Sequence, residues 1–487
     1  MSASPLCVTA NPSRSASSGR WRGLAVTLTG AFMAIMDAFI VNISLPTVRD
    51  DLHASFADAQ LIIAGYGLTY AVALITGGRL GDLYGRRRMF IAGLGGFTLA
   101  SLACGLAPTP NALIAARLLQ GLTAAAMFPQ VLSLMRVSFT DPRERAIAFA
   151  MLGATQGLAA VAGQIGGGLL VAADIYGLGW RPIFLINVPI GLVTMVAAAR
   201  VLDESTASAT RRLDLVGVVL SAVSLSLLLY PLMEGREAGW PYWAFVMLGL
   251  SVPAVVAFAW HQHGKSVAKA SPLVDTRLFR YRAFTAGMIA VLAVCTTLIP
   301  FFMILAFVLQ AGLGCTPLMA GAVFVPLAIA YAVASFGAGR AGPERSRAVL
   351  LIGGIILMLG YAAMACVNDL VDGLTGPEYV PALALLGIGQ GLVFTPLLNV
   401  VLSNISEQDA GIAAGVVSTM QQVGGALGVA VVGLIFFSAV AAAHERGMTD
   451  MAAYTTAFSF ALLYNIAAAG ATTLLIALLP QKPASRA

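Results

Sequence analysis

Apolar stretches of about 20 residues recur along the whole chain, separated by short polar segments that carry most of the charges. A helix needs a stretch of this length to cross the hydrocarbon core of a membrane. The pattern predicts fourteen transmembrane helices at approximately 24–46, 58–80, 89–107, 111–133, 146–171, 182–199, 213–233, 241–260, 283–309, 318–339, 348–367, 379–402, 411–443 and 454–480.

Composition excludes a soluble protein. Of the 487 residues, 59% are hydrophobic and 10% are charged, whereas soluble domains carry about 25% charged residues. So few charges cannot cover the surface of a soluble protein of this size. We therefore expect an all-α polytopic membrane protein, and residues 1–22, which are polar and lack an apolar core, predict no cleavable signal peptide.

No pattern in the sequence indicates an enzyme. The five cysteines and four histidines are scattered without metal-ligand spacing. The chain also has no Gly-rich phosphate loop and no Ser/His/Asp set. We expect no catalytic residue, no metal and no cofactor.

The basic residues are distributed unevenly between the loops. An even number of spans places both termini on one side, and if that side is cytoplasmic, 23 of the 28 basic residues lie in cytoplasmic segments. This bias predicts cytoplasmic termini in a plasma membrane, and the arrangement suits a bacterial host. The net charge of +6 then belongs to loops beside anionic lipid and does not indicate nucleic acid.

The two halves of the chain resemble each other weakly. A Gln-Gly-Leu sequence at 120–122 recurs at 390–392, and Gln156 has a counterpart in Gln421 at a similar offset. The repeat predicts two six-helix bundles with an inserted helix pair between them, and a substrate site between the bundles near the midplane. The expected limits are 1–22 for a cytoplasmic tail, 23–202 and 263–480 for the bundles, 203–262 for the inserted pair and 481–487 for a second cytoplasmic tail.

The segment between the second and third spans, residues 78–88, reads Gly-Arg-Leu-Gly-Asp-Leu-Tyr-Gly-Arg-Arg-Arg. Its glycines permit a tight turn and close helix contact, its aspartate can cap a helix N-terminus, and its arginines can bind lipid phosphate or a carboxylate. The segment resembles the signature loop of the major facilitator superfamily, which latches the two halves on the cytoplasmic side. The resemblance makes these residues candidates for conformational gating: Gly78, Asp82, Gly85, Arg86 and Arg87.

Further segments resemble the 14-helix drug:proton antiporters of that superfamily. They lie at 37–46, 117–121, 180–191, 272–280 and 421–428, and the likeness covers residues 24–480. It implies a proton-coupled exporter of amphiphilic or lipophilic compounds that works by alternating access, with the proton as coupling ion. The fifth helix departs from the family, because Gln164 follows Gly163 where a proline is usual, but Gly163 and Gly167 still permit close packing and remain gating candidates.

Two charged residues, Asp37 and Arg117, fall well inside predicted spans. A charge at a helix centre costs about 2.5–3.5 kcal/mol, so each needs a partner or a wet cavity. The helix directions place both at similar depth below the outer boundary, where they can pair. We expect Asp37 to carry the coupling proton with Arg117 as its partner. The alternative is an ion pair that only fixes the first helix against the fourth.

Amides supply the other polar groups of the spans. The candidates for substrate binding are Asn42, Gln120, Gln156, Gln310, Gln390, Asn399 and Gln421, and the alternative for each is a hydrogen bond between helices. Gln156 and Gln421 are the best of them because they occupy repeat-related positions. The spans of the second half contain no acid, which favours neutral, zwitterionic or monovalent substrates over divalent cations.

Other functions remain open at this point. The same fold can export or import a single metabolite, and a membrane sensor or scaffold without transport is a more distant alternative. The expected partners are a small-molecule substrate, protons and lipid, without nucleic acid, for a protein that acts as a monomer.

Overall fold

The computed structural model describes residues 12–206, 213–235, 238–268, 270–371, 373–403, 405–406 and 409–478. Over these residues the chain is helical with no strand, and fourteen segments are long and apolar enough to cross a membrane. The predicted class and number of spans are therefore confirmed.

The first six spans are formed by seven helices, because the sixth is broken after Leu185: α1 (Pro12–Leu52), α2 (Phe56–Tyr84), α3 (Arg86–Gly105), α4 (Pro110–Ser138), α5 (Pro142–Ala172), α6 (Pro182–Leu185) and α7 (Asn187–Val201). The inserted pair is α8 (Leu215–Glu234) and α9 (Tyr242–Val267). The last six spans are α10 (Arg282–Phe307), α11 (Pro317–Arg340), α12 (Ser346–Leu370), α13 (Val380–Leu402), α14 (Ala410–Glu445) and α15 (Asp450–Ala477). A π-helical turn extends α10 (Val308–Gly312), and short 3-10 turns lie at Ile175–Gly177, Thr276–Arg280, Pro343–Arg345 and Pro377–Tyr379.

The first helix is longer than its apolar stretch predicts. It begins at Pro12, inside the segment expected to be a polar tail, and continues past position 46 to Leu52. The part apolar enough to span a membrane is Gly19–Val41. Hydropathy detects the portion of a helix that matches lipid, so helical turns that project beyond it are not seen in the apolar pattern.

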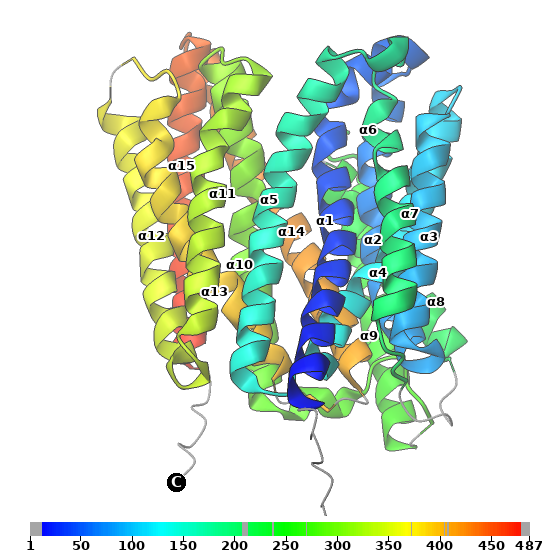
Figure 1. The fold of residues 1–487 in the computed structure, drawn as a ribbon. Coiled ribbons are helices and arrows are strands. Elements are labelled where there is room, and N and C mark those ends of the chain that lie inside the picture. Colours follow the sequence, from blue (N-terminus) through cyan, green and yellow to red (C-terminus); the bar gives the residue numbers. More distant parts are fainter. Residues whose placement is uncertain are drawn as a thin grey trace, which may run out of the picture.

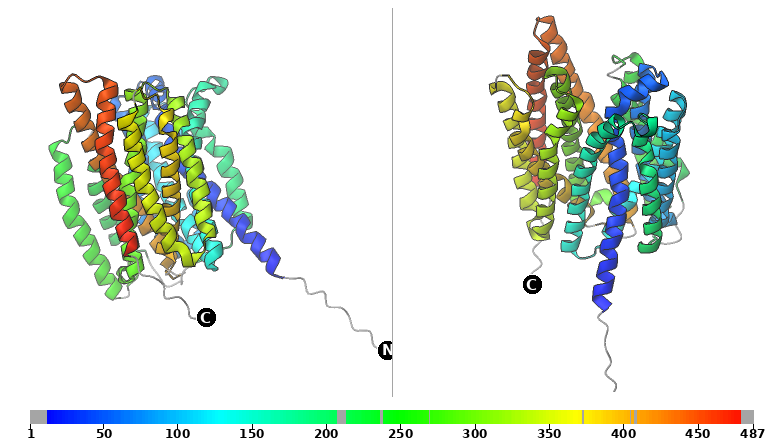
Figure 2. Two further views of the ribbon diagram at one scale, coloured as in Figure 1. Left: turned by 90° about the vertical axis from the view of Figure 1, so that its left-hand side faces the viewer. Right: turned by 45° about the horizontal axis from the view of Figure 1, so that its top comes forward.

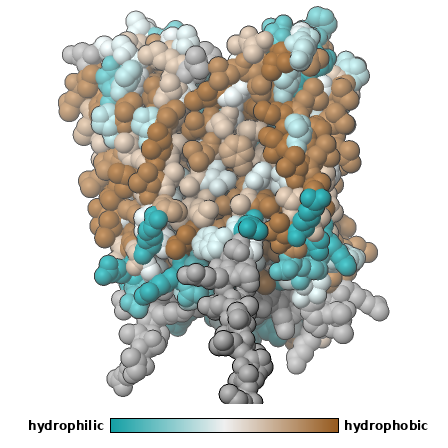
Figure 3. Space-filling model, viewed as in Figure 1, coloured by the Kyte–Doolittle hydropathy of each residue, from teal (hydrophilic) through white to brown (hydrophobic). Residues whose placement is uncertain are grey.

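The helices form two bundles that lie side by side (Figures 1 and 2). Between the bundles, α5 packs against α11 and α2 packs against α14. The helix α1 begins, and α15 ends, at the same face of the molecule, drawn at the bottom of Figure 1 and called the lower face below. On the face shown in Figure 3, apolar side chains predominate in the middle and hydrophilic ones gather towards the two ends, as expected for a protein surrounded by lipid.

The sequence repeat corresponds to matching helix contacts. A Cβ atom on Gly121 of α4 would lie 2.3 Å from the carbonyl oxygen of Tyr66 on α2. The repeat-related Gly391 of α13 would bring a Cβ to 2.5 Å from the carbonyl oxygen of Tyr331 on α11. Both positions therefore require glycine, and each holds two helices of its bundle in close contact.

At the face opposite the lower face, a polar clasp joins the end of α1 to the segment that leads into α6. The carboxylate of Asp51 accepts hydrogen bonds from Trp180 Nε1 at 2.9 Å and from Arg181 Nη1 at 2.8 Å. The Trp180 side chain is fully buried. The hydrogen bonds from Trp180 and then Arg181 hold the pKa of Asp51 below its usual range.

Replacing Asp51 by asparagine is expected to lower thermal stability at pH 7, because the buried Trp180 donor loses its carboxylate acceptor, at a cost of about 1–2 kcal/mol. A carboxyl whose pKa is lowered on folding stabilises the folded state above its unfolded pKa of about 4, and this contribution is lost as pH falls through the lower folded value. The difference in unfolding midpoint between wild type and Asp51→Asn, measured in detergent, should therefore shrink on acidification. The exposed neighbour Asp50 provides the control, since Asp50→Asn should change little; equal effects of both substitutions would contradict the clasp.

A buried carboxylate at the start of α8 joins the two inserted helices to each other. Asp214 caps α8 by accepting a hydrogen bond from the backbone N–H of Gly217 at 3.1 Å. It also contacts α9, where Lys265 Nζ lies at 2.8 Å and Gln262 Nε2 at 3.0 Å. The inserted helices are thus joined to each other by a defined polar contact and do not form a loose linker.

Candidate functional site

Asp37 and Arg117, the two charges predicted to share a depth in the membrane, form an ion pair. Nη1 of Arg117 lies 2.5 Å from Oδ2 of Asp37, and both side chains are at most 1% exposed. The contact joins α1 to α4 inside the first bundle. A buried pair of this kind needs further hydrogen bonds to offset the loss of water.

Neighbouring amides supply those bonds. Gln120 donates to Oδ1 of Asp37 at 2.9 Å and to Oγ of Ser101 at 2.8 Å. Asn187 donates to the same Oδ1 of Asp37 at 3.0 Å. The carboxylate is therefore held by donors from α4 and α7 together, in a network that four helices of the first bundle share.

Asn187 was not among the candidates from the sequence. Asn187 is the first residue of α7 and directly follows Ile186, which separates α6 from α7. Asn187 lies two residues before Pro189, near the start of the predicted span 182–199, where a polar residue resembles a helix boundary and its role is hidden. The likeness of residues 180–191 to the drug:proton antiporters was the available signal.

Arg117 also reaches the space between the bundles. Its Nε donates to the carbonyl oxygen of Ile62 at 3.0 Å, and its guanidinium carbon lies 4.3 Å from the centre of the Tyr66 ring. The hydroxyl of Tyr66 donates to the carbonyl oxygen of Ala34 on α1 at 3.0 Å. Tyr66 thus contacts the arginine of the ion pair and the helix that carries the aspartate.

A cavity of about 440 Å³ lies between the bundles. Its aromatic lining comes from both of them, and consists of Tyr66, Tyr70, Phe128, Phe302, Phe324, Tyr331, Phe394 and Phe39. Its amides are Gln156, Gln164, Gln390, Gln421 and Gln422. Among the described residues that line it, Arg117 is the one charged side chain, so the cavity is largely apolar with a few polar groups, as small-molecule sites usually are.

The structure separates the amide candidates into groups. Gln156, Gln390 and Gln421 line the cavity. Gln120 belongs to the ion-pair network, and Asn399 accepts a hydrogen bond from Arg145 at the lower face. Gln310 is exposed in the turn after α10. The side chain of Asn42 lies outside the described part of the structure.

The tyrosines of the cavity were not selected from the sequence. Tyr66 and Tyr331 face the space from α2 and α11, beside the matching glycine contacts described above. The hydroxyl oxygen of Tyr331 lies 3.4 Å from the hydroxyl oxygen of Thr395. Tyrosine is common in membrane helices, and its direction becomes visible only when the packing is known.

The signature loop joins the two bundles at the lower face. The carboxylate of Asp82, at the end of α2, accepts hydrogen bonds from the backbone N–H of Gly411 at 3.2 Å and of Ile412 at 3.0 Å. It also pairs with Arg86 at 2.7 Å. Asp82 therefore caps a helix, as its type predicts, but the helix is α14 of the other bundle.

The glycines of the loop make this contact possible. A Cβ on Gly78 would lie 2.2 Å from the carbonyl oxygen of Gly411. Gly85 has a φ of 105°, a conformation that other residues rarely adopt. The two glycines of the loop are thus required by the local geometry at the lower face.

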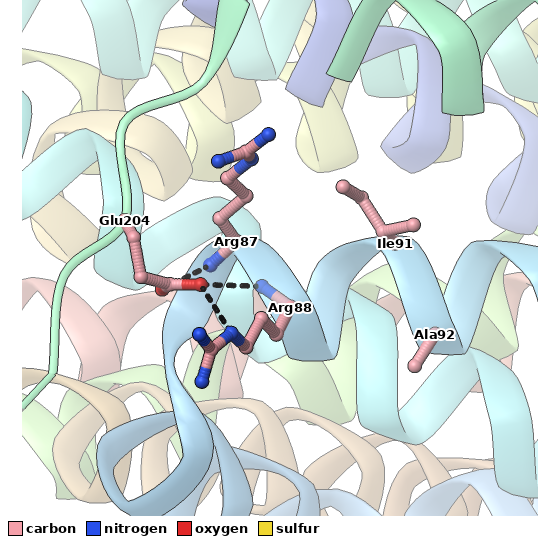
Figure 4. A pocket seen from close by; sticks show the side chains of 5 residues that line it. All are labelled: Arg87, Arg88, Ile91, Ala92 and Glu204. Atoms are coloured by element: carbon pink, nitrogen blue, oxygen red, sulfur yellow. Dashed lines mark hydrogen bonds and ion pairs between the residues drawn. The ribbon is translucent and has the colours of Figure 1, made fainter. Parts of the chain in front are cut away.

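Arg87 does not join the bundles. Its guanidinium donates to the carbonyl oxygen of Ala199 at the end of α7. Its backbone N–H, like that of Arg88, donates to the carboxylate of Glu204 at 3.2 Å, which caps the start of α3 (Figure 4). Arg87 and Glu204 therefore hold the loop against its own bundle.

Two further arginines join the bundles at the same face. Arg136 at the end of α4 donates to the carbonyl oxygens of Leu402 at 3.1 Å and Ile405 at 2.8 Å, at the end of α13. Arg145 of α5 donates to Oδ1 of Asn399 at 3.2 Å. Together with Asp82, these residues close the lower face beneath the cavity.

The glycines predicted in the fifth helix lie against α1. A Cβ on Gly163 would be 2.6 Å from the carbonyl oxygen of Met36, and one on Gly167 would be 2.9 Å from that of Ile40. The helix α5 is continuous through this region. The close packing expected from the glycines is present next to Asp37.

The sequence of the chain is similar to those of known transporters and resistance proteins. The sequence profile of the Major Facilitator Superfamily matches residues 27–429. The probable actinorhodin transporter of Streptomyces coelicolor is 39% identical over 93% of this chain and 78% of its own length. The puromycin resistance protein pur8 of Streptomyces alboniger is 35% identical over 91% of this chain and 88% of its own length. The multidrug resistance protein Stp of Mycobacterium tuberculosis is 33% identical over 88% of this chain and 78% of its own length.

A solved structure of the proton:xylose symporter XylE has the same fold. It superposes with a TM-score of 0.67 at 11% identity, covering 95% of this chain and 96% of the symporter chain. The family profile, the relatives and the fourteen spans define a multi-pass transporter of the plasma membrane and not an enzyme. The chain belongs to the major facilitator superfamily, and its relatives are of the drug-efflux type.

Proposed function

We propose that the protein is a proton-coupled antiporter that exports amphiphilic or lipophilic compounds by alternating access. The observation that carries the proposal is the buried pair of Asp37 and Arg117, with Arg117 at the wall of the cavity between the bundles. Ionisable residues inside a membrane are costly to bury and typically mark substrate or ion pathways. The export and resistance functions in the names of the relatives support the same proposal.

Coupling follows from the contacts of Asp37. When Asp37 takes up a proton, its attraction to the Arg117 guanidinium is lost, and Arg117 is then held by Ile62, Gln120 and the Tyr66 ring. Tyr66 lines the cavity, so a bound substrate and the proton act on the same two side chains. Binding of the proton can thereby change the affinity for the substrate, and binding of the substrate can change the affinity for the proton, as antiport requires.

The substrate class follows from the cavity walls. Aromatic rings on both sides suit a flat apolar molecule, and the glutamines supply donors and acceptors for its polar groups. Among the described residues that line the cavity there is no acid to balance a dication. The proposal is for neutral, zwitterionic or monovalent compounds, and actinorhodin, puromycin, tetracenomycin C and methylenomycin A are probes taken from the names of the relatives.

The test is uptake into inside-out vesicles that are acidified inside. Puromycin and tetracenomycin C should accumulate in vesicles containing the protein and not in vesicles without it. Nigericin, which dissipates the pH gradient, should abolish the accumulation. Uptake that persists after nigericin would contradict proton coupling, and preferred uptake of the dication propidium would contradict the substrate class.

A dedicated exporter of one metabolite is the second candidate. It is supported by relatives whose names give one compound each, and by the absence of the usual proline from α5. In the same vesicles, accumulation of a single probe with no inhibition by the others would favour this candidate over a broad exporter.

A further inference from the structure

The inserted helix α8 lies at the seam between the two bundles. It contacts α2 of the first bundle and α14 of the second. Its buried side chains include Leu225, Leu229 and Leu232, whereas Val216 and Val219 are exposed. One side of α8 therefore packs onto both bundles, and the other side is left for lipid.

The second inserted helix, α9, lies outside this contact. Only 11% of its span is buried, and it packs chiefly on α8. The Tyr230 and Trp243 rings of the two helices are 5.4 Å apart between centroids, and Asp214 joins their other ends. The helix α8 is thus held in the seam by α9 and by both bundles.

Near its last turn α8 reaches the cavity. Met233 is the one residue of the inserted pair among the described residues that line it. A Cβ on Gly67 of α2 would lie 3.2 Å from Cε of Met233, so the methionine side chain lies directly over this glycine. Gly67 and the neighbouring Tyr66 and Tyr70 line the same cavity.

We propose that α8 forms a wall of the substrate site and that Met233 is a specificity-determining residue that contacts the transported compound. This inference rests on the proposed function and extends it to the inserted pair. The unbranched thioether of methionine adapts to ligands of different shape and packs well on aromatic rings. Its position beside the tyrosines lets it set how large a compound the cavity accepts.

The test compares a larger probe, puromycin, with a smaller one, methylenomycin A. Dissociation constants are measured with the whole protein in detergent, so that the result does not depend on transport. Met233→Trp should weaken puromycin binding by about tenfold or more, because the larger side chain occupies part of the cavity. Methylenomycin A binding should change by less than about threefold.

Met247 on α9 is the matched control. It belongs to the same inserted pair but is not among the cavity residues, so Met247→Trp should leave both constants within about twofold. Met233→Ala adds no bulk, so it should fold even if Met233→Trp does not. It should shift the preference towards the larger probe. Changes that are equal for the two probes, or absent in both Met233 variants, would overturn the inference.

The outcomes separate this inference from the proposed function. Wild type that binds and transports the probes, with unchanged selectivity in the Met233 variants, overturns the role of Met233 alone. Wild type that binds the probes without proton-driven transport overturns the antiport, while the selectivity of the variants still decides the role of Met233. Wild type that neither binds nor transports them overturns both.

Discussion

Vesicles containing Asp37→Asn are expected to show ΔpH-driven transport at least about a hundredfold slower than wild type, because an amide cannot take up and release the coupling proton. Asparagine has the shape of aspartate, and its one carbonyl oxygen can still accept either the hydrogen bond from Arg117 or those from Gln120 and Asn187, which reach different oxygens of Asp37. Substrate binding in detergent should therefore be retained. The measurement is the initial rate of puromycin uptake per folded protein.

Two variants distinguish coupling from a structural ion pair. Asp37→Asn leaves the Arg117 charge uncompensated, and breaking a buried pair in this way costs about 3–5 kcal/mol. The double variant Asp37→Asn/Arg117→Gln removes both charges and should recover stability without recovering transport. Asp37→Glu keeps a titratable carboxyl and should retain part of the activity. Full transport by the double variant would reduce the pair to a structural role.

Replacing Asp82 by alanine is expected to open the lower face. The carboxylate makes three hydrogen bonds there, to Gly411, Ile412 and Arg86. A hydrogen bond to a charged group contributes about 1.5–3 kcal/mol, so loss of even one shifts the balance of states by about tenfold to a hundredfold. Transport should slow at least tenfold because the closed lower face forms less often.

Spin labels on the lower ends of the two bundles measure this shift. The distance between them should increase in Asp82→Ala, and puromycin binding should persist. Asp203→Asn, an exposed carboxyl that follows α7, is the control and should leave the distance distribution unchanged. An unchanged distribution in Asp82→Ala would show that Arg136 and Arg145 suffice to keep the bundles joined.

The spans and the ion pair could be predicted from the sequence because each leaves a local signal. An apolar stretch of fixed length identifies a span, and a charge within it requires a partner. The directions of the helices then place Asp37 and Arg117 at one depth. The repeat likewise selects Gln156 and Gln421, which the structure places in the cavity.

Other parts of the site depend on packing between distant segments. The type of Asp82 predicts a helix cap, but nothing near it indicates α14 as the helix. Gln120 and Asn399 are amides like Gln156, yet they bind an ion pair and a lower-face arginine because of the way their helices are turned. The contact of Asn187 with Asp37 depends on the packing of α7 against α1, and the place of Met233 depends on where the inserted pair docks.

The two halves differ where the repeat would predict likeness. The residue three positions before Gln120 is Arg117, whereas the residue three positions before Gln390 is Gly387. A Cβ on Gly387 would lie 2.2 Å from the carbonyl oxygen of Leu327, so this position serves helix contact. The charged site is therefore confined to the first bundle, although both bundles line the cavity.

We propose above that the protein exchanges substrate for protons and that Asp37 carries the proton. The most direct test of this exchange is the internal pH of acidified inside-out vesicles, followed with a fluorescent dye while puromycin is added. Puromycin should make the interior of wild-type vesicles less acidic, and it should have no such effect with Asp37→Asn. An equal pH change in the two preparations would contradict the proposal.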